Sequence, residues 1–323
     1  MCSRCPWALL MHKTGLSRQK SWGAKRLVCK RGAKVEKKTA QLIERLKTCG
    51  SLAVALSGGV DSATLAKAAG LALGDKAVAV TARSELLTAE ELADARKTAE
   101  AAGLRHVVLD VRDLDDPQIV ANDKERCYYC KRGRFQKLCA WAEENGFAFV
   151  ADGSNLDDGA DYRPGMRVIA ELAPKVISPF MECGWTKEDI RARARAWGLS
   201  VAEKPSAACL ASRIAYDLPL TAERLAQVEA AEKVLRPFAP GQLRVRHHGN
   251  LARIEAEPEA MEGIVARREE ITAKIKALGF SYVTLDLGGY RMGSTNEALR
   301  REDSPDGDGK RMRGDARETA GEV

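Results

Sequence analysis

The chain has 323 residues, of which 45% are hydrophobic and 30% charged, a balance that is ordinary for a globular protein. The length allows two domains that each bury a core, and no apolar run is long enough to cross a bilayer, which excludes a membrane-spanning protein. The net charge of +7 comes from residues 1–38, which carry +10, so the remaining chain carries −3 and does not predict a nucleic-acid partner.

The first 36 residues predict a basic, disordered arm. This is favoured over an RNA-binding arm because few aromatic side chains are present to stack on bases. The whole chain has nine cysteines, an odd number, and no secretory signal, so we expect reduced thiols and a cytoplasmic protein. Cys2 and Cys5 have a CxxC spacing, but zinc binding there is not favoured without a second pair.

Short apolar runs alternate with longer amphipathic ones from residue 37 onward. They predict helices over 40–49, 62–73, 88–102, 131–145 and 186–198, and strands over 52–56, 77–82, 106–111, 148–153 and 175–180. This alternation is typical of right-handed βαβ units on a parallel sheet with helices on both faces. We therefore expect an α/β domain with a doubly wound, Rossmann-like sheet over residues 37–203.

The pattern changes after residue 203 and predicts a smaller α+β domain over residues 204–298. Its expected elements are a helix, two strands around a turn, a second helix and a last strand, over residues 221–238, 242–257, 258–278 and 281–287. Residues 299–323 have almost no large apolar side chain and predict a disordered tail.

A glycine-rich turn separates the first predicted strand from the helix that follows it. A ligand crevice is expected at the carboxyl end of this strand. Two glycines allow close approach of the backbone, while two hydroxyls and the helix N-terminus make an anion cradle, in which an aspartate fits a bound Mg²⁺. The turn has neither the Walker nor the GxGxxG spacing, and a turn that binds nothing is the alternative. The predicted site residues are Ser57, Gly58, Gly59, Asp61 and Ser62.

The stretch S-G-G-V-D-S resembles the pyrophosphate loop of the N-type ATP pyrophosphatases, which split ATP into AMP and pyrophosphate to activate a carboxyl or carbonyl oxygen. Four further stretches, at residues 125–132, 152–167, 203–213 and 286–297, together resemble the LarE family. This family of ATP-dependent sulfur transferases helps to build the nickel-pincer cofactor of lactate racemase. The resemblance covers about residues 37–298.

The resemblance implies a small-molecule substrate, pyridinium-3,5-biscarboxylic acid mononucleotide, together with ATP and Mg²⁺. Transfer of AMP makes an acyl-adenylate of a ring carboxylate, and sulfur then displaces AMP to leave a thiocarboxylate. The resemblance further implies a homo-oligomer and a nickel-inserting partner that acts downstream.

Cys209 is the predicted catalytic residue for sulfur. It lies in a loop behind the last predicted strand, where Lys204 and Arg213 are close in sequence and predict a lowered thiol pKa. The alternative is a small buried side chain among alanines, and the resemblance favours the catalytic role.

Two sulfur sources are compatible with the resemblance. In the best-known form of the family, the cysteine that matches Cys209 gives up its own sulfur and becomes dehydroalanine. In other members, as in cluster-dependent tRNA thiolation enzymes, a CxxC pair and a distant cysteine hold a [4Fe–4S] cluster. Cys127, Cys130 and Cys209 fit that arrangement, and the paired spacing favours the cluster over simple packing.

The remaining candidates lie behind predicted strands or along one of them. Asp152, Asn155, Asp158 and Arg163 follow the fourth strand and are expected near the nucleotide or the acyl-phosphate. Arg244 and Arg246 alternate along one strand and, with Arg291, are expected to bind the substrate phosphate. The resemblance makes Glu232 and Glu255 metal ligands, which is not favoured, and His247 and His248 are expected at the surface.

Two other functions compete with this one. A tRNA thiolation enzyme would use the same chemistry but needs a basic face for RNA. A non-catalytic nucleotide-binding protein would keep the glycine loop and have no need of the Cys209 motif.

Overall fold

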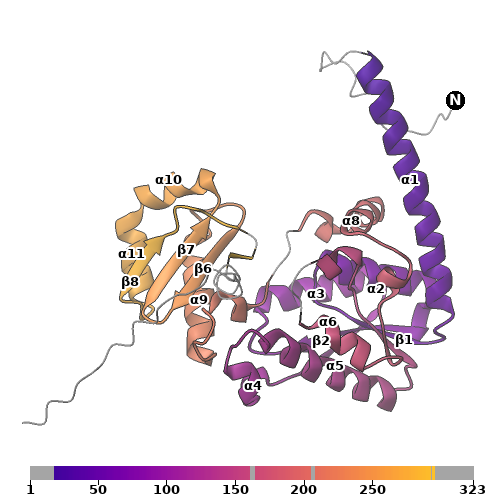
Figure 1. Ribbon diagram of the computed structural model, residues 1–323, viewed down its shortest axis with the longest axis horizontal. Coiled ribbons are helices and arrows are strands. Elements are labelled where there is room, and N and C mark those ends of the chain that lie inside the picture. The colour runs from indigo at the N-terminus through magenta and orange to yellow at the C-terminus, as the bar shows by residue number, and fades with distance from the viewer. Residues whose placement is uncertain (1–17, 161–163, 205–207, 292, 295–323) are drawn as a thin grey trace, which may run out of the picture. The chain divides into compact units, whose positions relative to one another are not determined.

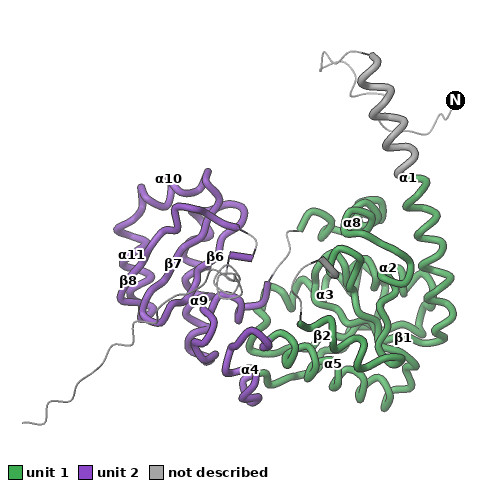
Figure 2. The backbone as a smooth tube through the Cα atoms, in the orientation of Figure 1, with its two compact units in different colours: residues 1–113, 127–207 green, residues 114–126, 208–323 purple. Residues whose placement is uncertain are grey.

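The computed structural model describes residues 18–160, 164–204, 208–291 and 293–294 (Figure 1). The chain divides into two compact units (Figure 2), residues 1–113 with 127–207, and residues 114–126 with 208–323. The predicted division at residue 203 did not include the segment 114–126, which clusters with the second unit. Among the described residues, no helix is long and apolar enough to span a membrane.

The first unit contains a five-stranded parallel sheet with the order β3-β2-β1-β4-β5. Its strands are β1 (Leu52–Ala55), β2 (Ala77–Arg83), β3 (Arg105–Asp110), β4 (Phe149–Ala151) and β5 (Val176–Ile177). The chain builds outward from β1 to β3 and then continues on the other side of β1 with β4. This confirms the doubly wound fold and places a topological switch point between β1 and β4.

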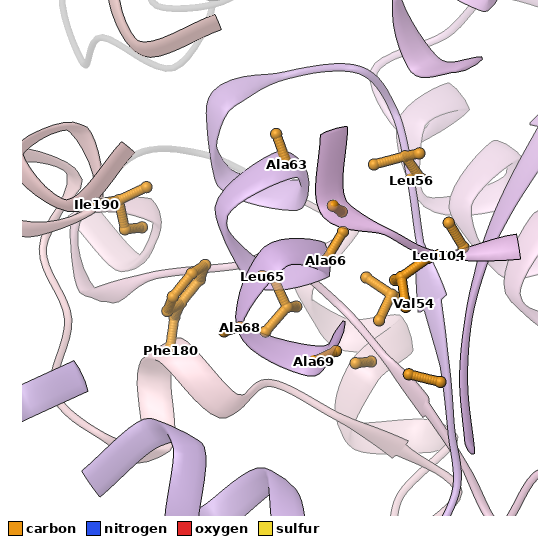
Figure 3. Close-up of a cluster of buried hydrophobic side chains, with 14 of the residues drawn as sticks. Val54, Leu56, Ala63, Leu65, Ala66, Ala68, Ala69, Leu104, Phe180 and Ile190 are labelled. Atoms are coloured by element: carbon orange, nitrogen blue, oxygen red, sulfur yellow. The ribbon is translucent and has the colours of Figure 1, made fainter. Parts of the chain in front are cut away.

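Helices cover both faces of this sheet. Alternate strand residues point to opposite sides, and apolar residues on each side are buried in a core of their own. Val54 belongs to the core under α1 (Arg18–Lys47), α2 (Val60–Leu73), α3 (Ala89–Ala102) and α8 (Lys187–Ala196), and α7 (Pro179–Glu182) lies on this side. Ala53 belongs to the opposite core, under α5 (Arg126–Glu144) and α6 (Met166–Glu171). Figure 3 shows the alanines of α2 with Phe180 and Ile190 on one side and Val54 and Leu104 on the other.

The predicted disordered arm is helical over residues 18–36, because α1 begins at Arg18. No proline interrupts residues 18–47, and lysine, arginine and alanine are good helix formers, whereas the prediction of disorder rested on charge and a missing apolar face. Among residues 32–47, the part of α1 whose side chains the structure describes, the buried stripe consists of Val35, Thr39, Leu42 and Leu46, with Cys49 just beyond the helix. The described packing of α1 into the first unit's core, where it contacts α2, thus includes residues close to the predicted boundary, and residues 1–17 lie outside the described part.

Removal of residues 1–31 is expected to leave pyrophosphate release within about twofold of the full chain, since every buried side chain of α1 that the structure describes, from Val35 onward, is retained. Removal through residue 42 deletes three buried side chains and should destabilise the first unit. The thermal midpoint and the initial rate of pyrophosphate release are measured for both truncated chains. Inactivity of a folded chain that starts at residue 32 would contradict this.

The second unit contains a three-stranded sheet with the order β6-β7-β8. Strands β6 (Leu243–His248) and β7 (Leu251–Ala256) are antiparallel, and β8 (Tyr282–Leu285) pairs in parallel with β7. Helices α9 (Ala222–Leu235), α10 (Pro258–Ala266) and α11 (Arg268–Lys276) complete this smaller α+β unit, as predicted. The single helix expected over 258–278 is divided into two at Arg267. The sequence did not predict this break because the helical spacing of apolar residues continues across it. The predicted tail, residues 299–323, lies outside the described residues.

Candidate active site

The glycine turn at the end of β1 has the geometry of an anion cradle. Gly59 is the N-cap of α2 and has no side chain that could accept a hydrogen bond from the helix. The first backbone N–H groups of α2 therefore face the turn without a side-chain cap. Gly58 has a φ of +74°, and a Cβ there would lie 3.2 Å from the backbone N of Ala95 in α3. The Ser57 and Ser62 hydroxyls are 3.1 Å apart.

A cavity of about 290 Å³ opens at this turn. The predicted residues that line it are Ser57, Asp61, Ser62, Asp152 and Asp158, and its other walls include Leu56, Val80, Thr81, Arg134 and Phe135. Apolar walls with a few convergent polar groups are typical of a ligand pocket, and the cavity lies at the sheet's switch point.

Asp61 contributes a carboxyl group to this cavity from the first turn of α2. Burial raises the pKa of its carboxyl group, and the ion pair with Lys187 opposes that rise only in part. Its Oδ1 atom is buried and has no hydrogen-bond partner among the described residues. Carboxylate oxygens are ligands that Mg²⁺ prefers, and this one accepts no hydrogen bond that would compete with a metal ion. The cradle therefore fits the predicted Mg²⁺.

The end of β4 forms the opposite wall of the cavity. Asp152 is buried, forms an ion pair with Lys131 (3.0 Å) and accepts a hydrogen bond from the backbone N of Ser154 (2.8 Å). Asn155 is buried and donates to the Asp158 carboxylate from its Nδ2 (3.1 Å), so it orients Asp158. Arg163, predicted at the same edge, lies outside the described residues.

Three cationic residues at this edge were missed from the sequence. Lys187 is the first residue of α8 and reaches Asp61, while Lys131 reaches Asp152 from α5. Arg134, one turn further along α5, donates to Asp113 and to Ser84 Oγ (2.6 Å). The rule that the carboxyl ends of parallel strands share one edge could have suggested Lys187, which follows β5 closely.

Cys209 lies in the second unit, in a segment that we call the Cys209 loop, residues 208–215. The half-buried cysteine caps a short 3-10 helix (Leu210–Arg213). The Arg213 guanidinium donates to the carbonyls of Ala208 and Cys209 (2.9 Å for Cys209) and pairs with Glu232 at 3.0 Å. Lys204 belongs to the first unit and pairs with Asp94 at 2.6 Å. Both cations predicted to activate the thiol are therefore paired with carboxylates.

Cys127 and Cys130 lie in the first turn of α5. Cys127 is exposed, which argues against a packing role, and Cys130 is half-buried with its Sγ 4.0 Å from Asp113 Oδ2. Among the described residues, no group of three or more His, Cys, Asp or Glu is arranged to hold a metal ion. The pair belongs to the first unit and Cys209 to the second, so the predicted cluster stays a prediction.

The two arginines of β6 are both buried, but their partners differ. Arg246 pairs with Glu255 at 2.8 Å and donates to the Ser212 carbonyl at 2.9 Å. Arg244 donates to the Leu243 carbonyl and lies over the Tyr290 ring, and no described carboxylate forms an ion pair with it. Burial and the nearby Arg213 lower the pKa of Arg244. It is therefore the stronger candidate for binding an anion.

Two further side chains in this region belong to the ion pairs just described. Glu232 and Glu255 each hold an arginine, which accounts for their burial without a metal. Arg291 is half-buried, with its Nη1 3.7 Å from Asp286 Oδ1.

The prediction that His247 lies at the surface is wrong, whereas His248 is exposed. His247 is 3% exposed, bonds Gln227 through its Nε2 (3.0 Å) and packs on the Phe280 ring. The alternation that turns Arg244 and Arg246 to one face puts His247 on the other face, with Leu243 and Val245.

Acid is expected to destabilise the protein through His247. Burial lowers the pKa of His247 from 6.5 to about 4, so between these values the unfolded chain binds a proton that the folded chain does not. The free energy of unfolding should fall by up to about 3 kcal/mol between pH 6.5 and 4 from this residue. Urea unfolding at several pH values compares the native chain with His247→Gln, whose slope should be shallower. Equal slopes would contradict this assignment.

Comparison with known proteins agrees with this geometry. The sequence model of the asparagine synthase family matches residues 35–122, which include β1, the glycine turn and β3. A pyridinium-3,5-bisthiocarboxylic acid mononucleotide synthase from Lactiplantibacillus plantarum is 38% identical over 266 residues, which cover 82% of this chain and 95% of that protein. An uncharacterised protein from Synechocystis is 40% identical over 77% of this chain and 92% of its own length. A tRNA-specific 2-thiouridylase MnmA from Rickettsia canadensis is 29% identical over 48% of this chain and 51% of its own length.

The parallel sheet, the glycine turn at its switch point and the match to asparagine synthase define an ATP pyrophosphatase of the PP-loop class. The similarity to the Lactiplantibacillus synthase runs through nearly all of that protein, so the chain belongs to the LarE family. This membership confirms the predicted fold class and enzyme class, an ATP-dependent sulfurtransferase that releases AMP and pyrophosphate.

Proposed function

We propose that this enzyme converts the ring carboxylates of pyridinium-3,5-biscarboxylic acid mononucleotide into thiocarboxylates. The strongest support is the geometry at Asp61. In the first turn of α2, its carboxylate has a buried oxygen without a hydrogen-bond partner among the described residues. The printed activity of the Lactiplantibacillus relative supports the choice of substrate.

The first step would activate a carboxylate in the first unit. The N–H groups of α2 and the hydroxyls of Ser57 and Ser62 bind the β- and γ-phosphates of ATP, and Asp61 would hold Mg²⁺, which neutralises phosphate charge. Lys187, which pairs with Asp61, would contact the same phosphates. A ring carboxylate oxygen attacks the α-phosphorus, the bond to the bridging oxygen breaks, and pyrophosphate leaves with the electron pair.

The second step would use Cys209. Its thiolate attacks the acyl carbon, and AMP leaves with the electron pair of the broken C–O bond. Loss of the Cα proton and cleavage of the Cβ–S bond then release the thiocarboxylate and leave dehydroalanine. The second possible source is an extra sulfide on the free iron of a [4Fe–4S] cluster that Cys127, Cys130 and Cys209 would hold, and this source would leave the Cys209 side chain intact.

Arg244, with Arg246 and Arg291, is proposed to bind the substrate phosphate. Because Arg246 is neutralised by Glu255, we expect Arg244→Gln to raise KM for the mononucleotide by about 10–100-fold, the worth of a charge-assisted hydrogen bond. Arg236→Gln, an exposed arginine of the same unit, is the matched control. Steady-state rates at varied mononucleotide measure this, and an unchanged KM would remove Arg244 from the site.

The wider assignments follow from the same proposal. The family resemblance implies a nickel-inserting partner downstream, for which the thiocarboxylate sulfurs would serve as metal ligands. The six cysteines whose side chains the structure describes form no disulfide, and we propose the cytoplasm, where thiols are kept reduced, as the compartment. A homo-oligomer is expected from the family resemblance alone.

Pyrophosphate release tests the proposal and its competitors together. We expect release from ATP only when the pyridinium mononucleotide is present. Binding of ATP without any release would favour a non-catalytic nucleotide-binding protein. Release that depends on tRNA would favour tRNA thiolation, the activity of the MnmA relatives.

A further inference from the structure

A short segment of the second unit, far in sequence from the rest of that unit, holds the Cys209 loop. This segment, which we call the strap, is residues 114–126; it follows β3 and contains α4 (Pro117–Val120) (Figure 2). The backbone N of Leu220 donates to the Val120 carbonyl at 2.9 Å, and the backbone N of Asp217 donates to the Asn122 carbonyl at 3.3 Å. The strap thus lies along the chain that follows the Cys209 loop.

Asn122 is the central anchor of the strap. It is completely buried, and its Nδ2 donates to the carbonyls of Ala215 and Leu218, both at 2.8 Å. Its φ of +57° is an uncommon backbone conformation for a residue other than glycine. A strained backbone persists only where its surroundings over-determine it, and here the two hydrogen bonds do so.

Arg126 is the second anchor and the last residue of the strap. It is 5% exposed, and its Nη1 donates to the Ala211 carbonyl at 3.0 Å and to Asn122 Oδ1. Its guanidinium also lies 5.7 Å from the centre of the Tyr216 ring. Burial of an arginine is costly unless its donors are satisfied, so these contacts fix the side chain firmly. Its peptide bond leads directly into Cys127.

The carbonyls of the Cys209 loop are held by cations and an amide along its length. Arg213 holds residues 208 and 209, and Arg246 holds residue 212. The strap supplies the other two contacts, to Ala211 from Arg126 and to Ala215 from Asn122. With the backbone fixed on both sides of it, Cys209 has little freedom to change position.

We propose that Asn122 and Arg126 are positioning residues that set the conformation of the Cys209 loop for sulfur transfer. Neither side chain needs to touch the substrate. A displacement of about 1 Å at a reacting atom can lower a rate about a hundredfold, so loss of either anchor should slow transfer strongly. The link to transfer rests on the proposed function, whereas the anchoring of the loop does not.

The test uses the full chain and three strap variants. Asn122→Gly keeps the positive φ and removes the side chain, Arg126→Met removes the donors, and Arg126→Lys keeps the charge. Lys124→Met, an exposed strap residue, is the matched control for lost charge. Each is assayed for thiocarboxylate formation, ATP affinity, the rate at which iodoacetamide labels Cys209, and hydrogen exchange of residues 208–215.

We expect Asn122→Gly and Arg126→Met to lower thiocarboxylate formation by at least about tenfold. Cys209 labelling and exchange in the loop should change at least severalfold, with ATP affinity retained and partial rescue in Arg126→Lys. Unchanged labelling and exchange in both loss variants would overturn the proposal, as would slow transfer with unchanged labelling. If the native chain forms no thiocarboxylate while loop labelling still responds, the proposed function fails and the anchoring stands. Should the loss variants not fold, Arg126→Lys and Asn122→Asp give the same two readouts.

Discussion

Asp61→Ala is expected to lower pyrophosphate release by at least about a hundredfold, because it removes the oxygen that would hold Mg²⁺ and the partner of Lys187. The fold should not suffer. Burial raises the pKa of Asp61, so at neutral pH its ionised form opposes folding rather than supporting it. The thermal midpoint of Asp61→Ala should therefore equal or exceed that of the native chain, while ATP turnover is lost.

Asp75→Ala is the matched control, since Asp75 is an exposed aspartate of the same unit. Its turnover should match the native chain. A second variant, Lys187→Met, tests the proposed phosphate contact of Lys187 separately from the proposed Mg²⁺ binding by Asp61. It leaves the Asp61 carboxylate in place and should reduce turnover by weakening phosphate binding. Normal turnover in Asp61→Ala would show that the glycine turn is not the phosphate site.

Cys209→Ala is expected to abolish thiocarboxylate formation whichever sulfur source operates, with pyrophosphate release retained. Cys127→Ala distinguishes the sources. If Cys209 gives up its own sulfur, the native protein becomes lighter by one H₂S after a single turnover, and Cys127→Ala still transfers once. If three thiolates hold a cluster, anaerobically made protein contains iron and sulfide, and Cys127→Ala is as inactive as Cys209→Ala. The exposure of Cys127 argues against packing, and the paired spacing of Cys127 and Cys130 favours this second result.

Cys139→Ala is the control, because Cys139 lies on the same helix and burial raises the pKa of its thiol. It should leave both steps unchanged. Repeated turnover in the Cys127→Ala, Cys130→Ala double variant would eliminate the cluster. Thiocarboxylate formation by Cys209→Ala would eliminate both sources.

The sequence predicted those parts of the fold that rest on local pattern. The five strands of the first sheet are apolar runs, and the glycine turn is a contiguous motif, so both were recognisable before any contact was known. The helical start of α1 at Arg18 was missed because composition reports charge and says little about helix propensity.

The parts that the sequence did not predict depend on long-range contacts. Lys187 is ordinary in sequence and gains its role only when α8 brings it to Asp61. The strap joins the second unit although it stands between two elements of the first, and its anchors bond residues about ninety positions away. Arg246 is predicted to bind phosphate from the alternation of its strand, and that pattern does not reveal its ion pair with Glu255 on the neighbouring strand.

The mass of the mononucleotide after reaction is the most direct test of the central claim. After incubation of the protein with ATP, Mg²⁺ and pyridinium-3,5-biscarboxylic acid mononucleotide, we expect species in which first one and then both carboxylates have exchanged an oxygen for sulfur, and none of them with Cys209→Ala. A mononucleotide that returns unchanged, or only as its adenylate, from the active native protein would contradict the proposed sulfur transfer.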